Sequence, residues 1–153
     1  MPQRMILFVC TGNLCRSPMA EYLLKDRLGP ESSWRVMSAG LFAVSGMSAS
    51  PHAVGVLAAR NIDLGPHRSR LLTREWVDAA SLIVVMTKSH REQLQALHRN
   101  AREKVFLLRS FDPAADSGDL DDPIGATLET YREARDAIES ALPGLVDFMR
   151  ELQ

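Results

Sequence analysis

Four short apolar runs recur along the chain, and each has the length of a β-strand. They are bounded by polar or turn residues, and the segments between them carry apolar residues at helical spacing. Strands that alternate with helices predict a parallel sheet with helices on both faces, so the expected fold class is α/β, doubly wound, with four strands. The expected strands are Met5–Val9, Trp34–Ser38, Leu82–Met86 and Val105–Leu108.

The helical pattern occurs in four segments. Gly29 followed by Pro30 is expected to end the first of them. Pro143, followed by Gly144, is expected to kink or restart the last, because proline lacks the N–H that continues a helix. The expected helices are Met19–Leu28, Pro51–Arg60, Lys88–His98 and a long helix that begins at about Leu128.

Size and composition set broad limits on function. A chain of 153 residues is expected to form one domain over residues 1–153, because folding at this length buries about two-thirds of the unfolded surface. The net charge of −1 does not indicate a binding surface for nucleic acid or for an acidic membrane. No apolar run approaches the roughly 18 residues of a membrane span. The first apolar stretch is too short for a signal peptide.

The two cysteines, Cys10 and Cys15, lie in one loop and do not indicate a structural disulfide framework. We therefore expect a soluble, unprocessed cytoplasmic protein. The sequence does not indicate its oligomeric state.

Cys10 and Arg16 delimit a loop that joins the first expected strand to the first expected helix. Such a loop can turn its backbone N–H groups inward around an anion while the guanidinium closes the ring. A lone cysteine at the end of a buried strand is usually an inert core residue, but burial gives no reason for an arginine and a helix start to lie so close to it. We therefore interpret Cys10 as a nucleophile and call residues 10–16 the phosphate loop.

Local signals within the phosphate loop favour the same interpretation. Gly12 and Asn13 are residue types that tolerate the left-handed backbone conformation that such a curl requires. Ser17 followed by Pro18 has the pattern of an N-cap and a first helical residue. A helix that begins there directs the positive end of its dipole at the bound anion and at the sulfur of Cys10.

The segment Ser110–Thr127 is the one long connection, and it is rich in aspartate, proline and glycine. Loops of this length in compact domains are often functional. Most of its aspartates are expected to form a solvated acidic turn. Two of them, Asp112 and Asp122, precede a proline.

These motifs resemble the low-molecular-weight protein tyrosine phosphatases, bacterial type. The family motif V-C-x-G-N-x-C-R-S-P matches Val9–Pro18, and the family's Asp-Pro before the last helix matches Asp122-Pro123. The likeness extends along nearly the whole chain, so it is far more specific than the loop alone. The further matches are Ser38-Ala39-Gly40, Pro51 with Ala53, Asn61-Ile62-Asp63-Leu64, His67 with Ser69, Met86-Thr87 and Tyr131.

The resemblance implies a role for each matching residue. Cys10 attacks phosphorus, Arg16 binds the equatorial oxygens, and Asp122 protonates the leaving atom. Asp122 is preferred to Asp112 because it lies close before the last helix, as in the family. The remaining implied residues are Thr11, Gly12, Asn13, Leu14, Cys15 and Ser17 in the phosphate site, Ser38 and His67 as supports of the loop together with Asn13 and Ser17, and Phe42 and Ile124 in the pocket wall.

The chemistry of such a site explains these residue types. Cys10 must react as a thiolate, which a helix N-terminus and a nearby arginine stabilise. Displacement leaves a phosphoryl group on Cys10 and splits hydrolysis into two easier steps. Arg16 and the loop amides supply the positive charge, so no cofactor or metal is expected. The histidines His52, His67, His90 and His98 show no metal-ligand spacing.

Two substrate classes, phosphotyrosine and phosphoarginine, are compatible with the resemblance. Phosphotyrosine enzymes of the family usually carry aromatic residues after the Asp-Pro, whereas this chain has Ile124-Gly125, which weakens a stacking wall. A bacterial branch that dephosphorylates protein phosphoarginine resembles this chain in that turn but carries Thr at the position of Leu14. Because Leu14 favours a flat aromatic phosphoester, we expect a protein tyrosine phosphatase acting on phosphorylated proteins, with a protein arginine phosphatase as the alternative.

Other classes fit less well. Arsenate reductases share the scaffold but relay oxidation to further cysteines, and none follows Cys15. A catalytically silent phosphate-binding module does not need Cys10, Arg16 and Asp122 together. The cysteine pair is not spaced C-x-x-C, and no nucleotide-binding glycine motif is present. Cys15 is either a partner for a reversible disulfide with Cys10 or a small apolar filler.

Overall fold

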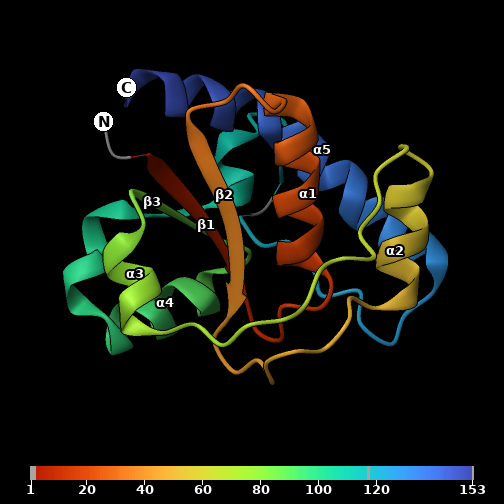
Figure 1. The fold of residues 1–153 in the computed structure, drawn as a ribbon, viewed down its shortest axis with the longest axis horizontal. Helices are drawn as coiled ribbons and strands as arrows, with labels where there is room; N and C mark the ends of the chain where they lie inside the picture. The colour runs from red at the N-terminus through yellow and green to blue at the C-terminus, as the bar shows by residue number, and fades with distance from the viewer. Residues whose placement is uncertain (1–2, 117, 153) are drawn as a thin grey trace.

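Four parallel strands form one sheet in the computed structural model, which describes residues 3–116 and 118–152 (Figure 1). The order across the sheet is β2-β1-β3-β4. In the register, Phe8 lies between Ser38 on one neighbouring strand and Val84 on the other. The four-stranded parallel sheet expected from the sequence is confirmed. The strands are β1 (Arg4–Cys10), β2 (Trp34–Gly40), β3 (Leu82–Val85) and β4 (Val105–Leu107).

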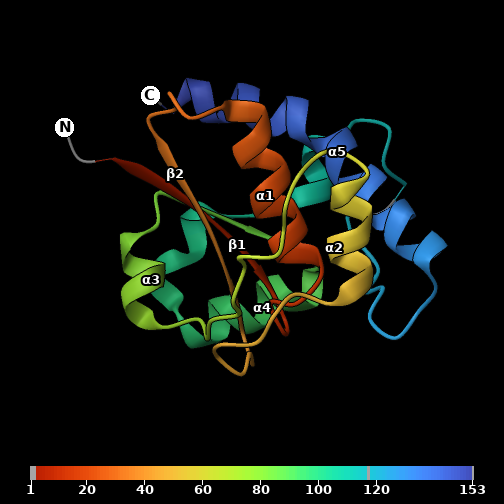
Figure 2. The ribbon, with the colours of Figure 1, turned by 45° about the vertical axis from the view of Figure 1, so that its right-hand side comes forward.

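Helices cover both faces of the sheet, as the alternation of side chains along β1 requires. Ile6 and Phe8 are buried in a core shared with three helices, and Leu7 and Val9 are buried in a second core shared with two others. Figures 1 and 2 show the two groups on opposite sides of the sheet. The first group is α1 (Arg16–Leu28), α2 (Pro51–Ala58) and α5 (Leu128–Glu151), and the second is α3 (Arg74–Ala79) and α4 (Lys88–Leu97); the 3-10 helices η1 (Arg99–Lys104) and η2 (Leu108–Phe111) flank β4.

The helix bounds lie close to the expected ones, except that α3 is not indicated by the sequence pattern. Gly29 ends α1 with a φ of 78°, a conformation that suits glycine. The helix α3 has six residues and buries one of them, Val77. So short an element shows no hydrophobic period, which explains why the pattern misses it.

The expected interruption at Pro143 is wrong, because α5 continues through it as one helix of 24 residues. Proline removes one backbone hydrogen bond, and the burial of Leu142 and Leu145 beside it offsets that loss. At Gly144 an added Cβ would lie 2.2 Å from the backbone oxygen of Phe111, so η2 rests directly on the backbone of α5. Although α5 is long, no helix among the described residues is both long and apolar enough to cross a bilayer.

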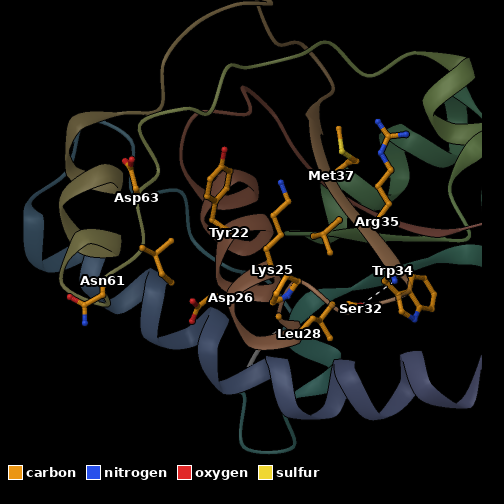
Figure 3. Close-up of a pocket in the computed structure, with 14 residues that line it drawn as sticks. Tyr22, Lys25, Asp26, Leu28, Ser32, Trp34, Arg35, Met37, Asn61 and Asp63 are labelled. Carbon is orange, nitrogen blue, oxygen red and sulfur yellow. Dashed lines mark hydrogen bonds between the residues drawn. The ribbon is translucent and has the colours of Figure 1, made fainter.

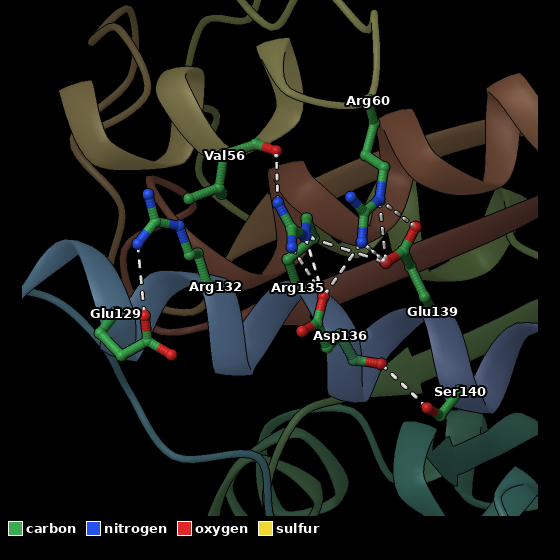
Figure 4. Close-up of polar contacts among 8 residues, drawn as sticks. All are labelled: Val56, Arg60, Glu129, Arg132, Arg135, Asp136, Glu139 and Ser140. Atoms are coloured by element: carbon green, nitrogen blue, oxygen red, sulfur yellow. Dashed lines mark hydrogen bonds and ion pairs between the residues drawn. The ribbon is translucent and has the colours of Figure 1, made fainter.

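Polar contacts hold α2 against α5 (Figure 4). Arg60, just after α2, donates to the carboxylate of Glu139 through Nε and Nη2, each at 3.0 Å. From α5, Arg135 donates to the backbone oxygen of Val56 at 3.1 Å. Because α2 begins directly after Ser50, which contacts the phosphate loop, these contacts also fix the surroundings of that loop.

Candidate active site

The phosphate loop lies at the carboxyl end of β1. The strand β1 has β2 on one side and β3 on the other, so the order of the strands reverses there. In open α/β sheets, ligands bind beyond the carboxyl ends of the strands at such a switch point. Cys10 is the last residue of β1 and Arg16 is the first of α1, so the loop between them ends at a helix N-terminus, which favours anions.

Asn13 supplies the left-handed turn of the phosphate loop. Its φ is 58°, as expected, and its backbone N–H donates to Sγ of Cys10 at 3.3 Å. Gly12 is expected to be left-handed as well, but its φ is not positive, so that expectation is wrong. Asn13 alone among the described residues of the loop takes this conformation, and its N–H faces the sulfur.

Ser17 faces the sulfur of Cys10 and is not the N-cap that the sequence pattern predicts. The helix α1 begins at Arg16, with Cys15 at the N-cap position and no side-chain cap. The Oγ of Ser17 lies 2.8 Å from Sγ of Cys10, which is only 3% exposed. The hydroxyl of Ser17 therefore contacts the sulfur of Cys10, whereas the sequence pattern predicts that it caps the backbone of α1.

A chain of hydrogen bonds fixes the direction in which Ser17 donates. The buried carboxylate of Glu21 accepts from Ser38 at 2.6 Å. The amide of Asn13 donates to both Ser38 and Ser17 at 2.9 Å, and its oxygen accepts from the backbone N–H of Arg70 at 3.0 Å, which fixes the amide orientation. Because Ser17 accepts from Asn13, its own proton is free to point at the sulfur. Two donors at one sulfur suit a negatively charged atom.

His67 holds the phosphate loop through its backbone. Its Nε2 lies 2.9 Å from the carbonyl oxygen of Asn13, and since a carbonyl only accepts, Nε2 carries the proton. Burial lowers the pKa of His67, which favours the neutral ring. Asn13 is thus the residue on which the two expected supports, Ser38 and His67, converge.

Arg16 joins the phosphate loop to the segment that carries Asp122. The arginine is 4% exposed. Its Nη1 donates to the backbone oxygen of Leu120 at 2.9 Å, and its Nη2 lies 3.4 Å from Oδ2 of Asp122, whose side chain is 43% exposed. Asp112, the other aspartate before a proline, accepts from the backbone N–H of Ala114 within its own turn. The geometry therefore brings together Cys10, Arg16 and Asp122.

Three further anchors hold residues 118–124, which we call the acid loop. Leu120 is buried, and its N–H donates to the backbone oxygen of Met86 at 2.8 Å. Arg109 donates to the backbone oxygen of Asp119 at 3.0 Å. The first N–H of α4, at Lys88, donates to Oδ1 of Asp119 at 2.8 Å. The position of Asp122 therefore depends on Arg109 and on residues 86–88, in addition to Arg16.

Thr11 is exposed at the mouth of the phosphate loop, and its Oγ1 lies 2.9 Å from Nε2 of His90. His90 is buried in the first turn of α4. Burial, and secondarily the charge of Arg16, lower the pKa of His90 to about 4, so the ring is neutral at neutral pH. The sequence pattern does not single out this histidine as part of the site.

Cys15 and Leu14 contact the core beside the phosphate loop. Sγ of Cys15 lies 3.4 Å from the hydroxyls of Ser50 and Tyr131, and burial raises the pKa of its thiol. Leu14 is half-buried and packs against the same core. Cys10 and Cys15 are both free thiols in this structure. A packing role for Cys15 follows from these contacts.

The two residues expected in the pocket wall are highly exposed. Phe42 is 66% exposed, and its N–H donates to the backbone oxygen of Thr11 at 3.0 Å, next to the phosphate loop. Ile124 is 53% exposed, and its N–H donates to Oδ1 of Asp122 at 3.1 Å. One thus adjoins the phosphate loop and the other adjoins the acid.

A hollow of about 740 Å³ opens between α1, β2 and the turn after α2, away from the phosphate loop (Figure 3). Its lining includes Tyr22 and Lys25 from α1, Trp34 and Met37 from β2, and Asp63. None of its lining residues belongs to the phosphate loop or to the acid loop. This hollow is therefore separate from the residues that surround Cys10.

Glu21 and His90 are the site residues that sequence reasoning misses. Glu21 stands one helical turn after Ser17, so spacing alone could mark it as facing the loop, but its partner Ser38 comes from another element. His90 follows the N-cap Thr87, yet its partner Thr11 lies far away in the chain. Only the folded sheet shows that these residues meet.

Comparison with known proteins agrees with this geometry. Residues 5–153 match the family model described as low molecular weight phosphotyrosine protein phosphatase. The chain is 42% identical over 153 residues to a protein-arginine-phosphatase of Geobacillus stearothermophilus, with all of both chains covered. It is 38% identical over 147 residues to a probable low molecular weight protein-tyrosine-phosphatase, EpsP, of Ralstonia solanacearum, covering 96% of this chain and 97% of the relative.

A solved structure is similar over nearly the whole chain. It is a cysteine-to-serine mutant of the YwlE arginine phosphatase with a phosphorylated active-site serine, at 38% identity and a TM-score of 0.88, covering 95% of each chain. The family match and these relatives extend over the sheet, the phosphate loop and the acid loop alike. The chain therefore belongs to the low molecular weight phosphotyrosine protein phosphatase family.

Proposed function

We propose that this chain is a cytoplasmic protein phosphatase that hydrolyses phosphotyrosine through a phosphocysteine intermediate. One observation carries the proposal: the sulfur of Cys10 faces the donors Ser17 and Asn13, in the same site as the Arg16–Asp122 pair. The proposed nucleophile, phosphate-binding cation and acid therefore lie in one site. A silent phosphate-binding module would not need a thiol that faces two hydrogen-bond donors, and this difference favours the enzyme.

In the first step, the Cys10 thiolate attacks phosphorus in line with the departing tyrosine oxygen. The S–P bond forms as the P–O bond breaks, and Asp122 gives its proton to the phenolate. Arg16 and the inward N–H groups bind the three equatorial oxygens, whose charge they offset. The thiolate and the phosphate dianion repel each other, so this electrostatic term is the main contribution to catalysis.

In the second step, water attacks the phosphocysteine. The Asp122 carboxylate formed in the first step accepts a proton from that water, the S–P bond breaks, and Cys10 returns to the thiolate as phosphate leaves. The exposure of Asp122 suits this role because water reaches its carboxylate. The chain of bonds from Glu21 to Ser17 supports the returning negative charge on sulfur.

An arginine phosphatase is the second candidate, because a relative of that name shares 42% identity over the full chain. Leu14 and Phe42 favour the aromatic substrate: an apolar side chain in the phosphate loop and a ring beside it can flank a flat phenyl group. Ile124 lacks an aromatic face, which leaves the tyrosine pocket with one aromatic wall.

The test is a side-by-side measurement of kcat/KM on phosphotyrosine and phosphoarginine versions of one peptide, with wild type and Leu14→Thr. The proposal expects wild type to prefer phosphotyrosine and Leu14→Thr to reduce that preference. A preference of wild type for phosphoarginine would instead establish the second candidate. If the protein binds phosphate but hydrolyses neither peptide, it is a catalytically silent phosphate-binding module and the proposal is wrong.

A further inference from the structure

Exposed large hydrophobic side chains gather around the candidate active site. The described residues include six of them: Phe42, Val44, Met47, Leu71, Leu97 and Ile124. Phe42 and Ile124 adjoin the phosphate loop and the acid. Val44, Met47 and Leu71, which we call the apolar rim, belong to two segments that lie beside the phosphate loop, and Leu97 alone stands at the far end of α4.

Hydrogen bonds hold the first rim segment beside the phosphate loop. Directly after β2, the N–H groups of Leu41 and Phe42 donate to the backbone oxygens of Cys10 and Thr11, at 2.9 and 3.0 Å. Val44 and Met47 follow within a few residues. Figure 2 shows this segment beneath the end of β2, next to the turn from β1 into α1. The rim is thus attached to the backbone that carries the nucleophile.

The second rim segment is bonded to the first. Buried Ser69 donates from Oγ to the backbone oxygen of Val44 and accepts from the N–H of Met47, the latter at 3.0 Å. The N–H of Leu71 donates to Ser45 Oγ at 3.2 Å, and Leu71 forms a β-bridge with Gly40. The three rim side chains therefore project from a fixed backbone and do not depend on a mobile loop for their placement.

The first rim segment carries no charge, whereas the second contains Arg68 and Arg70 close to Leu71. Between Arg35 and Arg60 the sequence contains no Asp, Glu, Lys or Arg. A ligand that contacts the three rim side chains gains from burial of apolar surface. Exposed apolar patches on soluble proteins mark binding surfaces, and this one adjoins a reactive site.

We propose that the apolar rim of Val44, Met47 and Leu71 binds apolar residues that flank the phosphorylated side chain of a protein substrate. The inference rests on the proposed function. A phosphoryl group held in the phosphate loop brings its neighbouring peptide across the segments attached to that loop. The rim has three side chains, 43% to 69% exposed, and so falls short of the roughly 800 Å² that each partner of a stable complex buries. A short peptide fits that extent better than a second copy of this chain.

The experiment compares wild type with the rim variant Val44→Ser/Met47→Ser/Leu71→Ser and with the matched control Leu97→Ser. Three substrates are used: para-nitrophenyl phosphate, a phosphotyrosine peptide flanked by Leu and Ile, and the same peptide flanked by Ser and Asn. Wild type is expected to prefer the apolar peptide. The rim variant is expected to lose about tenfold in kcat/KM on that peptide, mainly through KM, a loss of roughly 1.4 kcal/mol. Its rates on the other two substrates, and all rates of Leu97→Ser, stay within about twofold of wild type.

Equal kcat/KM of wild type and rim variant on the apolar peptide would overturn the inference. Sedimentation of both proteins provides a second check: a wild-type dimer that becomes a monomer in the rim variant would assign the patch to self-association and also overturn it. Binding of non-hydrolysable phosphonate versions of both peptides separates this inference from the proposed function. If binding depends on the rim but neither peptide is hydrolysed, the inference about the rim stands and the proposed function fails. If the peptides are hydrolysed at rates that do not depend on the rim, the proposed function stands and the inference fails.

Discussion

Nη2 of Arg16 lies 3.4 Å from Oδ2 of Asp122, so the proposed phosphate-binding cation is already paired with the proposed acid. The same guanidinium donates to the backbone oxygen of Leu120 two residues earlier. One buried side chain therefore sets the distance between the phosphate loop and the acid loop. A phosphate that enters the loop meets both groups together, which places the acid near the leaving atom.

Asp122→Ala should reveal the acid through its dependence on the leaving group. Turnover on phosphotyrosine or phenyl phosphate, whose leaving groups need a proton, is expected to fall by about 100-fold or more. Turnover on activated aryl phosphates is expected to fall far less. The measurement is kcat across a series of aryl phosphates. Asp112→Ala is the control, and equal losses of Asp122→Ala across the series would discredit the assignment.

Arg109→Met should also lower turnover on poor leaving groups, although Arg109 is not the proposed acid. Arg109 holds the backbone oxygen of Asp119 and so positions the acid loop. Its loss is expected to lower kcat on poor leaving groups by about 10-fold to 100-fold, because small displacements of a catalytic group are costly. Exposed Arg102→Met serves as control. In the double variant with Asp122→Ala the Arg109 effect should largely vanish, and full additivity would show that Arg109 acts by another route.

His90 predicts a loss of stability in mild acid. Its pKa is lowered from 6.5 to about 4 in the folded protein, so between these values the unfolded chain takes up a proton on His90 that the folded protein does not. The free energy of unfolding should therefore fall as the pH drops through this window, and this contribution is fully present above pH 6.5.

His90→Gln should flatten that dependence in urea unfolding. Glutamine retains groups that can bond to Thr11, and the slope that remains includes His67, whose pKa is also lowered by burial. His67→Gln added to His90→Gln should flatten the curve further. An unchanged slope in both variants would contradict the neutral, buried state of these rings.

Two glycine substitutions should have opposite effects on stability. Gly144→Ala places a Cβ 2.2 Å from the backbone oxygen of Phe111, and the clash should lower the free energy of unfolding by about 1–3 kcal/mol. Gly55→Ala in α2 meets no atom within 4 Å, so the gain in helix propensity should raise it by about 0.5–1 kcal/mol. Denaturant midpoints measure both. A neutral Gly144→Ala would show that η2 can move away from α5.

Local sequence patterns predict the parts of this molecule that local forces decide. The phosphate loop is one such part, since Cys10 ends a buried strand and the left-handed Asn13 turns the chain toward α1. Gly12 and Ser17 depart from expectation because contacts within the fold decide their roles. Residue type alone does not show that the hydroxyl of Ser17 serves a sulfur.

Tertiary contacts decide the rest. Glu21 and His90 join the site only because strands and helices bring Ser38 and Thr11 to them. The helix α5 continues through Pro143 because packing offsets one missing hydrogen bond. A pattern of residue types describes propensities, whereas these outcomes depend on partners that are distant in sequence.

The central claim is that Cys10 becomes phosphorylated during turnover, and a pre-steady-state acid quench with intact-mass analysis tests it most directly. With excess aryl phosphate, wild type should release a burst of phenolate equal to its own concentration and carry one phosphoryl group on Cys10. Cys10→Ala should show neither burst nor adduct. Phosphate release by Cys10→Ala at the wild-type rate, or an adduct on another residue, would contradict the account.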